Sequence, residues 1–458
     1  MDRVNPATGE ALEPIEGHSD EEVDDALARA STAFESWRDR SMIERRELLA
    51  DAADVLRENT EEYAEIMTRE MGKPITGAVS EVEKCAWVCE YYAETAGEQL
   101  ADERRPSASE ASVFVSYEPL GPILAVMPWN YPFWQVFRFA APHLTAGNVG
   151  LLKHASNVPE CAMAIADVFE RAGYPEDVFQ SLLIGSEQVE AILEDDRLRA
   201  ATLTGSEPAG RAVAETAGRE LKKTVLELGG SDPFVVLDDA DLDAAAATGA
   251  GARTLNSGQS CIAAKRFIVH EDVYDEFLGK FTDEMDGLTV GDPTDETTDV
   301  GPQAREDLLN DLHDQVERTL DDGASLELGG EPMDRDGFYY PPTVLTDVPR
   351  DAAAACEETF GPAAAVFRVS DVEAAIELAN DVDFGLGASV WTEDLERGER
   401  VARRFEAGCC FVNELVKSDP RVPFGGMKNS GYGRELAGHG IREFVNKKTV
   451  WVQNADSE

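Results

Sequence analysis

The segment Thr224–Cys261, TVLELGGSDPFVVLDDADLDAAAATGAGARTLNSGQSC, decides how the chain is organised. Its first residues predict a buried strand that ends on Gly229 and Gly230. A second strand and an alanine-rich helix are expected before the segment closes on Cys261 in a Gly-Gln-Ser turn. The intervening strand and helix are therefore long enough to bring Glu227 and Cys261 close together in the fold. Such a pair suits covalent thiol chemistry, in which a cysteine attacks a carbonyl group and a carboxylate activates water.

The cysteines and histidines do not indicate a metal site. Most cysteines are inert core residues, so Cys261 alone would be weak support for catalysis. The seven cysteines include no CxxC pair, and the six histidines have no metal-ligand spacing. We therefore expect a reduced protein with no metal.

The chain length predicts two or more domains, and the distribution of apolar residues predicts no membrane-spanning segment. The 458 residues exceed what one hydrophobic core usually supports. No run approaches the 18 or more apolar residues of a membrane span. The first ten residues, MDRVNPATGE, show no basic region followed by an apolar one, so we expect a cytoplasmic location.

The net charge of −49 excludes two classes of partner. Nucleic acid and anionic membrane would both be repelled by such an excess of carboxylates. The acidic residues recur through nearly every segment instead of forming one tail. A dispersed acidic surface of this size favours adaptation to high salt over an ordinary acidic protein, because molar salt screens the self-repulsion.

The order of predicted elements indicates an α/β protein. Residues 19–100 read as helices, the first of them opened by a capping box at Ser19. Residues 107–118 alternate like an exposed β-ribbon, which is a candidate oligomer arm that residues 449–452 could pair with. From Pro119 strands and helices alternate, which predicts a doubly wound, mostly parallel sheet.

Several short motifs follow predicted strands, and each has an ordinary structural interpretation. Trp129, Asn130 and Tyr131 form a constrained turn, and Asn130 could donate to a developing oxyanion, although turn asparagines are common. Lys153 ends a strand, where it could reach a ribose, although most lysines are simply solvated. Ser206 follows Gly205 at a strand-to-helix turn that suits a phosphate.

Taken in order, PWNYP, KHAS, TGSxxxG, LELGG, GQSC, EETFGP and PFGG resemble the aldehyde dehydrogenase superfamily over nearly the whole chain. WNYPFWQVFR, LLKHASN and ELGGSDPF are similar to the branch that acts on succinate semialdehyde. The resemblance implies a Rossmann-type cofactor domain, an α/β catalytic domain and a small β oligomerisation arm. The implied ranges are 1–106 with 119–229, 230–423, and 107–118 with 446–458, respectively. It also implies a homodimer or homotetramer.

The resemblance assigns a role to each motif. Cys261 would be the nucleophile, Asn130 would stabilise the oxyanion together with the Cys261 backbone N–H, and Glu227 would activate the hydrolytic water. The remaining implied residues would hold NAD or NADP, and they are Trp129, Lys153, Ser156, Gly205, Ser206, Leu228, Glu358 and Phe360.

Two positions bear on specificity. Relatives that prefer NAD often carry a Glu three residues after the lysine, and the small neutral Ser156 stands there, so NADP is the expected preference. Arg138 and Ser418 could bind the distal carboxylate of succinate semialdehyde. For Arg138, a structural ion pair is an equally good interpretation. Ala263 occupies the position of a second cysteine in some relatives, so no redox switch is expected.

Three other functions stay open on the sequence. The chain could oxidise another small or aliphatic aldehyde, it could be a thiol hydrolase, or it could be a catalytically silent scaffold. A hydrolase would not need the cofactor residues, and a scaffold would not need Asn130, Glu227 and Cys261 together.

Overall fold

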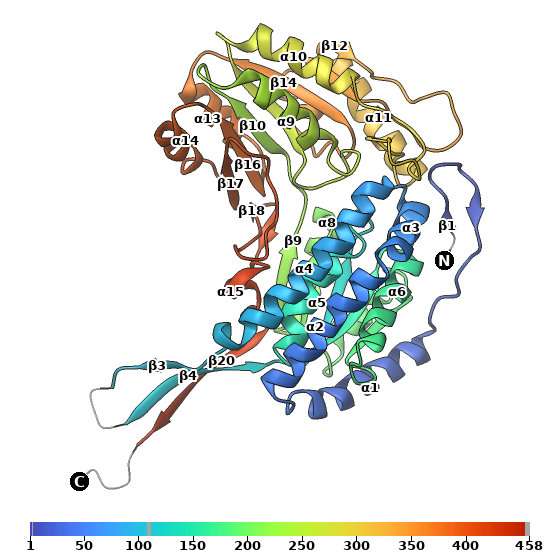
Figure 1. Ribbon diagram of the computed structural model, residues 1–458, viewed down its shortest axis with the longest axis vertical. Coiled ribbons are helices and arrows are strands. Elements are labelled where there is room, and N and C mark those ends of the chain that lie inside the picture. Colours follow the sequence, from blue (N-terminus) through green and yellow to red (C-terminus); the bar gives the residue numbers. More distant parts are fainter. Residues whose placement is uncertain (2, 108–110, 454–458) are drawn as a thin grey trace.

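The computed structural model describes residues 1, 3–107 and 111–453. Parts of the predicted arm, residues 108–110 and 454–458, lie outside the described residues. Two large sheets organise the molecule, each in its own α/β body, and a β-ribbon projects from one end (Figure 1). None of the helices in the described ranges is long and apolar enough to cross a membrane.

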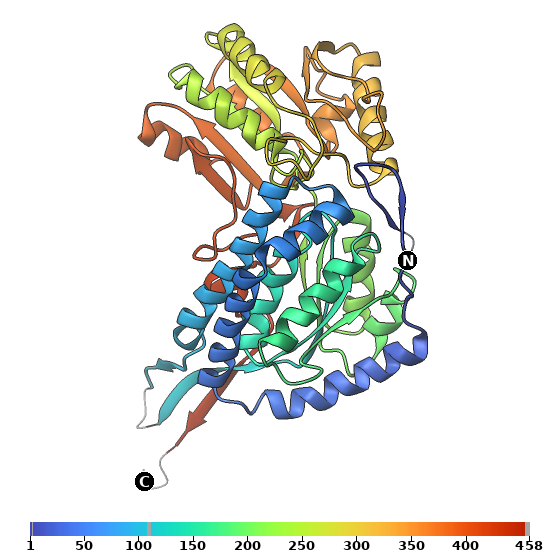
Figure 2. The ribbon, with the colours of Figure 1, turned by 45° about the vertical axis from the view of Figure 1, so that its right-hand side comes forward.

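The first body contains a six-stranded sheet that is parallel except at one edge. Its strand order is β19 (Gly431–Tyr432), β9 (Lys223–Glu227), β8 (Ala200–Thr204), β5 (Pro122–Met127), β6 (Val149–His154) and β7 (Phe179–Leu182). The accompanying helices are α1 (Asp20–Trp37), α2 (Met42–Glu58), α3 (Thr60–Met71), α4 (Ile75–Gln99), α5 (Trp134–Thr145), α6 (Pro159–Arg171), α7 (Val189–Glu194) and α8 (Glu207–Arg219). Figure 2 shows the N-terminal helices covering this sheet.

Local sequence accounts for these elements. The capping box expected at Ser19 is confirmed, and Ser41 forms a second one with Glu44. Central strands such as β5 are apolar along their whole length, since helices cover both faces of a parallel sheet.

The second body contains a seven-stranded sheet, which begins immediately after Gly229 and Gly230. Its strand order is β12 (Ser325–Leu328), β13 (Thr343–Thr346), β14 (Ala363–Val369), β11 (Ala264–His270), β10 (Asp232–Val236), β16 (Gly387–Trp391) and β17 (Cys409–Val412). Its helices are α9 (Leu242–Thr254), α10 (Tyr274–Asp286), α11 (Glu306–Asp321), α12 (Ala353–Cys356), α13 (Val372–Asn380) and α14 (Leu395–Ala402). Alternate residues of β10 pack on opposite faces, Val235 in one hydrophobic cluster and Phe234 and Val236 in the other.

The projecting ribbon pairs β4 (Ser112–Pro119) with β3 (Glu103–Arg105) and β20 (Val445–Val452). The expected pairing of residues 449–452 with the ribbon is therefore confirmed, and it extends back to Val445. The remaining short elements are β1 (Arg3–Val4), β2 (Ala11–Leu12), β15 (Phe384–Gly385), β18 (Met427–Lys428) and α15 (Ala437–Gly440).

Residues 424–445, which the predicted domain ranges left unassigned, return the chain to the first sheet. Gly431 pairs with Glu227, at the end of β9. Gly431 has φ +106°, and a Cβ there would collide with the carbonyl oxygen of Leu226. Glycine is therefore needed at this position, where the sequence had suggested only a structural turn.

Candidate active site

The predicted site residues converge on one edge of the first sheet. Strands β9, β8, β5 and β6 are neighbours and run in parallel, so their carboxyl ends share that edge. Ligands of open α/β sheets bind outside this edge. Predicted residues lie at the end of each of the four strands or just after it. In order from β9 to β6 these are Glu227 and Leu228, Gly205 and Ser206, Trp129 and Asn130, and Lys153 and Ser156.

The loop before Cys261 has an unusual backbone. Asn256, Ser257 and Gly258 have φ angles of +55°, +57° and +76° in succession. A Cβ at Gly258 would collide with the backbone of Gly361, and the Ser257 hydroxyl accepts a hydrogen bond of 2.9 Å from the Gly301 N–H. Left-handed conformations of this kind persist where the surroundings fix them, and they cluster at functional sites.

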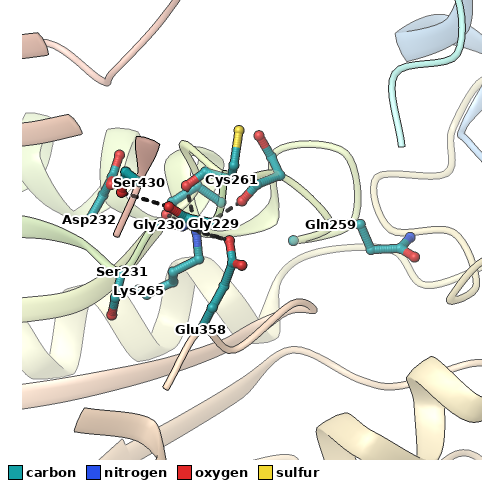
Figure 3. A network of polar contacts seen from close by, with 12 residues as sticks. Gly229, Gly230, Ser231, Asp232, Gln259, Cys261, Lys265, Glu358 and Ser430 are labelled. Carbon is teal, nitrogen blue, oxygen red and sulfur yellow. Dashed lines mark hydrogen bonds and ion pairs between the residues drawn. The ribbon is translucent and has the colours of Figure 1, made fainter. Parts of the chain in front are cut away.

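Lys265 holds the cysteine loop from the inside. Its side chain has no exposure, and Nζ donates to the backbone carbonyls of Ser260, Cys261 and Ala263 at 2.9, 2.8 and 3.1 Å. The same ammonium lies 3.7 Å from Glu358 Oε1, which accepts a 3.0 Å hydrogen bond from the Gly230 N–H (Figure 3). Lys265 therefore links the cysteine loop to Glu358, a predicted cofactor residue.

The Cys261 thiol is half-buried. Burial raises its pKa to about 12, and the positive charge of Lys265 opposes that rise. The thiol is therefore protonated in the free protein near neutral pH. Within the described ranges, the Cys261 backbone N–H donates no hydrogen bond, so it is available to an oxyanion.

Asn130 is fixed against the same loop. Its Nδ2 donates to the Gln259 carbonyl at 3.1 Å, and Asn256 Nδ2 donates to the Asn130 carbonyl at 2.7 Å. His154, whose consequence the sequence did not reveal, lies 2.9 Å through Nε2 from the Pro132 carbonyl. Burial lowers the pKa of His154 to about 4, so a neutral imidazole holds the Asn130 turn against the end of β6.

A cavity of about 470 Å³ opens beside Cys261. Its lining comes from α4, α5, the cysteine loop and residues 415–424, and includes Tyr131, Arg138 and Ser418. Asn130 and Glu227 are not among the lining residues. The structure thus brings Cys261 together with both predicted substrate residues, whereas Asn130 and Glu227 are buried and do not line this cavity.

Arg138 is both an ion-pair partner and a wall of this cavity. Its side chain is 2% exposed and forms an ion pair with Glu435. Its guanidinium lies 4.8 Å above the Phe424 ring. Among the described residues Arg138 Nη2 has no hydrogen-bond partner, so the ion pair leaves a donor for a ligand.

Glu227 is a buried carboxylate whose two oxygens have no hydrogen-bond partner among the described residues. Burial raises its pKa well above the usual range, and the neighbouring Glu435 raises it further. A carboxylate with a raised pKa and free lone pairs can take a proton from water. A Cβ on Gly425 would lie 2.5 Å from Glu227 Oε1, so glycine leaves room for the carboxylate.

The strand edge fits a dinucleotide. Ser206 precedes α8 without capping it through its side chain and is exposed, so the first N–H groups of the helix remain open to a phosphate. Burial lowers the pKa of Lys153, and Ser156 beyond it is exposed. Trp129 and Phe360 contact edge to face, with ring centres 5.7 Å apart.

Four residues that shape the site were not singled out from the sequence: Lys265, Glu435, Lys84 and Glu81. Glu81 Oε1 accepts hydrogen bonds of 2.9 Å from the Phe133 and Trp134 N–H groups and so caps α5, which carries Arg138. Its buried ion pair with Lys73 completes the anchor. For Glu81 and Lys84, the only signal in the sequence was their helical spacing, which places both on the face of α4 that packs against the protein.

Within the described residues, the arrangement combines a half-buried thiol, an unpaired backbone N–H, a buried carboxylate and the carboxyl edge of a parallel sheet, which is compatible with an oxidoreductase acting through a cysteine. The chain matches the aldehyde dehydrogenase family over residues 1–450. It belongs to that family.

Named relatives narrow the comparison. The chain is 55% identical over 449 residues to a protein of Synechocystis sp. named "Probable succinate-semialdehyde dehydrogenase, NADP(+)", covering 98% of this chain and 99% of that one. It is 53% identical to "Succinate-semialdehyde dehydrogenase, NADP(+), 1" of Mycobacterium tuberculosis, with 98% and 99% covered. The crystal structure of succinic semialdehyde dehydrogenase from Streptococcus pyogenes with NADP+ superposes with a TM-score of 0.97 at 38% identity, covering 99% of this chain and 100% of that chain.

Proposed function

We propose that this protein oxidises succinate semialdehyde to succinate with NADP, through a thioester on Cys261. The observation that carries the proposal is the cavity in which Cys261, Arg138 and Ser418 lie together. A reactive thiol at one part of the cavity and a cation at another fit a small aldehyde that ends in a carboxylate. Relatives at 53–55% identity that carry this name support the same substrate.

The chain's own residues would act in the following order. Cys261 Sγ gives its proton to water in the cavity and bonds to the aldehyde carbon, whose C=O π electrons move onto the oxygen, while the Asn130 amide and the Cys261 N–H donate to that oxyanion. When bound, NADP would supply the hydride acceptor; the carbon attached to Cys261 Sγ gives up its C–H electron pair as hydride, and the oxyanion re-forms the C=O bond of a thioester. Glu227 then takes a proton from water, whose oxygen attacks the thioester and releases the acid as the C–S bond breaks.

Residues along the strand edge would hold the cofactor. Ser206 and Gly205 would contact the pyrophosphate at the start of α8, and Glu358 would contact the nicotinamide ribose beside Leu228 and Phe360. Lys153 would reach the adenine ribose, and Trp129, whose ring contacts Phe360, would lie near the nicotinamide end. Ser156 places no negative charge near a 2′-phosphate, which supports NADP over NAD.

The test is the reduction of NADP and NAD at 340 nm with succinate semialdehyde, butanal and other neutral aldehydes. We expect kcat/KM to be highest for succinate semialdehyde with NADP, because the cation in the cavity and the neutral Ser156 both favour that combination. A higher kcat/KM for neutral aldehydes would keep the thiol mechanism and reject the substrate. Absence of cofactor reduction with every aldehyde would favour a silent scaffold.

The ribbon supports an assembly of identical chains, which we propose to be located in the cytoplasm. Trp451 and Val452 on β20 are 59% and 50% exposed on a ribbon that projects from the body (Figure 1). Large apolar side chains on a protruding strand are typical of subunit contacts. A homodimer or homotetramer would cover them.

The acidic surface should make the fold depend on salt. On α11 six carboxylates are exposed: Glu306, Asp307, Asp311, Asp314, Glu317 and Asp321. Because molar salt screens charges beyond about 3 Å, we expect the midpoint of thermal unfolding to fall by several degrees from molar KCl to dilute buffer. Sucrose in place of KCl serves as the control. An unchanged midpoint would contradict adaptation to salt.

A further inference from the structure

Lys84, on α4, lines the cavity beside Arg138 and Ser418. Its Nζ donates to the Ser418 hydroxyl oxygen at 2.8 Å and lies 4.4 Å from the centre of the Trp134 ring. Both contacts are with neutral groups, so they leave the ammonium charge uncompensated. Because Ser418 accepts from Lys84, its own O–H is free to donate toward the cavity.

The carboxylates nearest to Lys84 already have partners. Glu81 forms the buried ion pair with Lys73 and caps α5. Asp419 lies 2.5 Å from Arg421. Across the part of the chain that the structure describes, Lys84 takes part in no ion pair with a carboxylate.

The other titratable groups around Lys84 do not neutralise it either. Arg138, which lines the same cavity, carries the same charge. The Cys85 thiol is neutral, because burial raises its pKa well above the usual value. Glu296 and Asp299 also line the cavity, and Glu296 is exposed while Asp299 accepts the Thr289 N–H at 2.8 Å.

Lys84 is half-buried and Arg138 is buried, and among the described residues Arg138 pairs with Glu435 whereas Lys84 has no carboxylate partner. An unpaired cation held partly out of water beside a like charge is costly. Burial, followed by repulsion from Arg138, lowers the pKa of Lys84 to about 8. The unliganded cavity therefore has an unfavourable electrostatic free energy, which a bound carboxylate would reduce. A neutral aldehyde would leave it in place.

We propose that Lys84 binds the distal carboxylate of the substrate together with Arg138 and the Ser418 hydroxyl, and so selects aldehydes that carry an acid. This inference rests on the proposed function and deepens it by naming a specificity residue outside the family motifs quoted above. Arg138 shares its charge with Glu435, whereas Lys84 has no competing anion. Lys84 is therefore the cation of the cavity that is free for substrate.

The proposal has a pH signature. Below pH 8 Lys84 is charged in the free enzyme, and KM for succinate semialdehyde should be lowest there. As the pH rises through about 8, Lys84 loses its proton and KM should rise, since the neutral amine no longer attracts a carboxylate. KM for butanal should not follow this curve.

The test compares Lys84→Met, Lys84→Arg and the control Lys417→Met with the wild-type enzyme. Lys417 lines the same cavity, but its side chain is 52% exposed and pairs with Glu414 at 2.6 Å. We expect Lys84→Met to lower kcat/KM for succinate semialdehyde about 10- to 100-fold, mainly through KM, while butanal is unaffected. Lys84→Arg should restore part of the loss, and Lys417→Met should behave as wild type.

Binding of succinate, measured by calorimetry, gives a readout that does not depend on turnover. Lys84→Met should weaken succinate binding by the same factor. The KM of this variant for succinate semialdehyde should not rise above pH 8, whereas that of the wild-type enzyme should. Equal losses with succinate semialdehyde and butanal, or no loss with either, would overturn the role of Lys84. If the wild-type enzyme itself prefers butanal, the proposed substrate fails instead, and the two failures are distinguishable.

Discussion

Cys261→Ala is expected to lower the rate of cofactor reduction by about four orders of magnitude or more, because among the described residues no other cysteine lines the cavity to form the thioester. The loss should be the same with succinate semialdehyde and with butanal, since the thiol attacks the group that both substrates share. The variant should fold normally, because the Cys261 side chain is half-buried and the loop is held through its backbone by Lys265.

Cys410→Ala is the matched control, since Cys410 is an exposed thiol on β17. It should retain wild-type activity. Substantial turnover by Cys261→Ala, with an unchanged unfolding midpoint, would contradict the assignment of the nucleophile.

The second large effect concerns release of the product. Glu227→Gln should lower the steady-state rate about 100- to 10,000-fold, because amide cannot take a proton from water. Acylation does not need this base, so the variant should still reduce about one equivalent of cofactor per site in a rapid burst. Stopped-flow absorbance at 340 nm separates the burst from the slow phase.

The pH dependence gives the sign of the effect. Glu227 works as the deprotonated base and its folded pKa is raised, so the wild-type rate should rise with pH through that pKa and the Gln variant should lose this limb. Glu435→Gln removes the like charge that raises the pKa of Glu227, so the rise in the rate of this variant should occur at lower pH than in the wild-type enzyme. A Glu227→Gln enzyme with no burst, or with the wild-type pH limb, would remove Glu227 from deacylation.

Local sequence patterns predict most of the helices and strands. Strands such as β5 and β8 are continuous apolar runs between turn residues, and the Ser19 capping box marks the start of α1. The order of motifs then places Cys261, Asn130 and the strand-end residues at one site. The division into cofactor, catalytic and oligomerisation domains stays a prediction, as do the individual catalytic roles.

What the sequence leaves out depends on contacts between distant segments. Lys265 opens an apolar strand, and only the folded turn brings three carbonyl groups to its ammonium. Glu435 follows a glycine-rich turn, and its ion-pair partner Arg138 lies about two thirds of the chain length away in sequence. Lys84 reads as a solvated lysine of a long helix, because nothing local shows that this face of α4 meets a cavity.

The central claim is a thioester between Cys261 and the acyl group of succinate. The most direct measurement is the intact mass of the Glu227→Gln enzyme after reaction with succinate semialdehyde and NADP, followed by peptide mapping. We expect a mass increase of one succinyl group per chain, located on the peptide that contains Cys261 and absent when NADP is omitted. An unmodified Cys261 peptide after a full burst of cofactor reduction would contradict it.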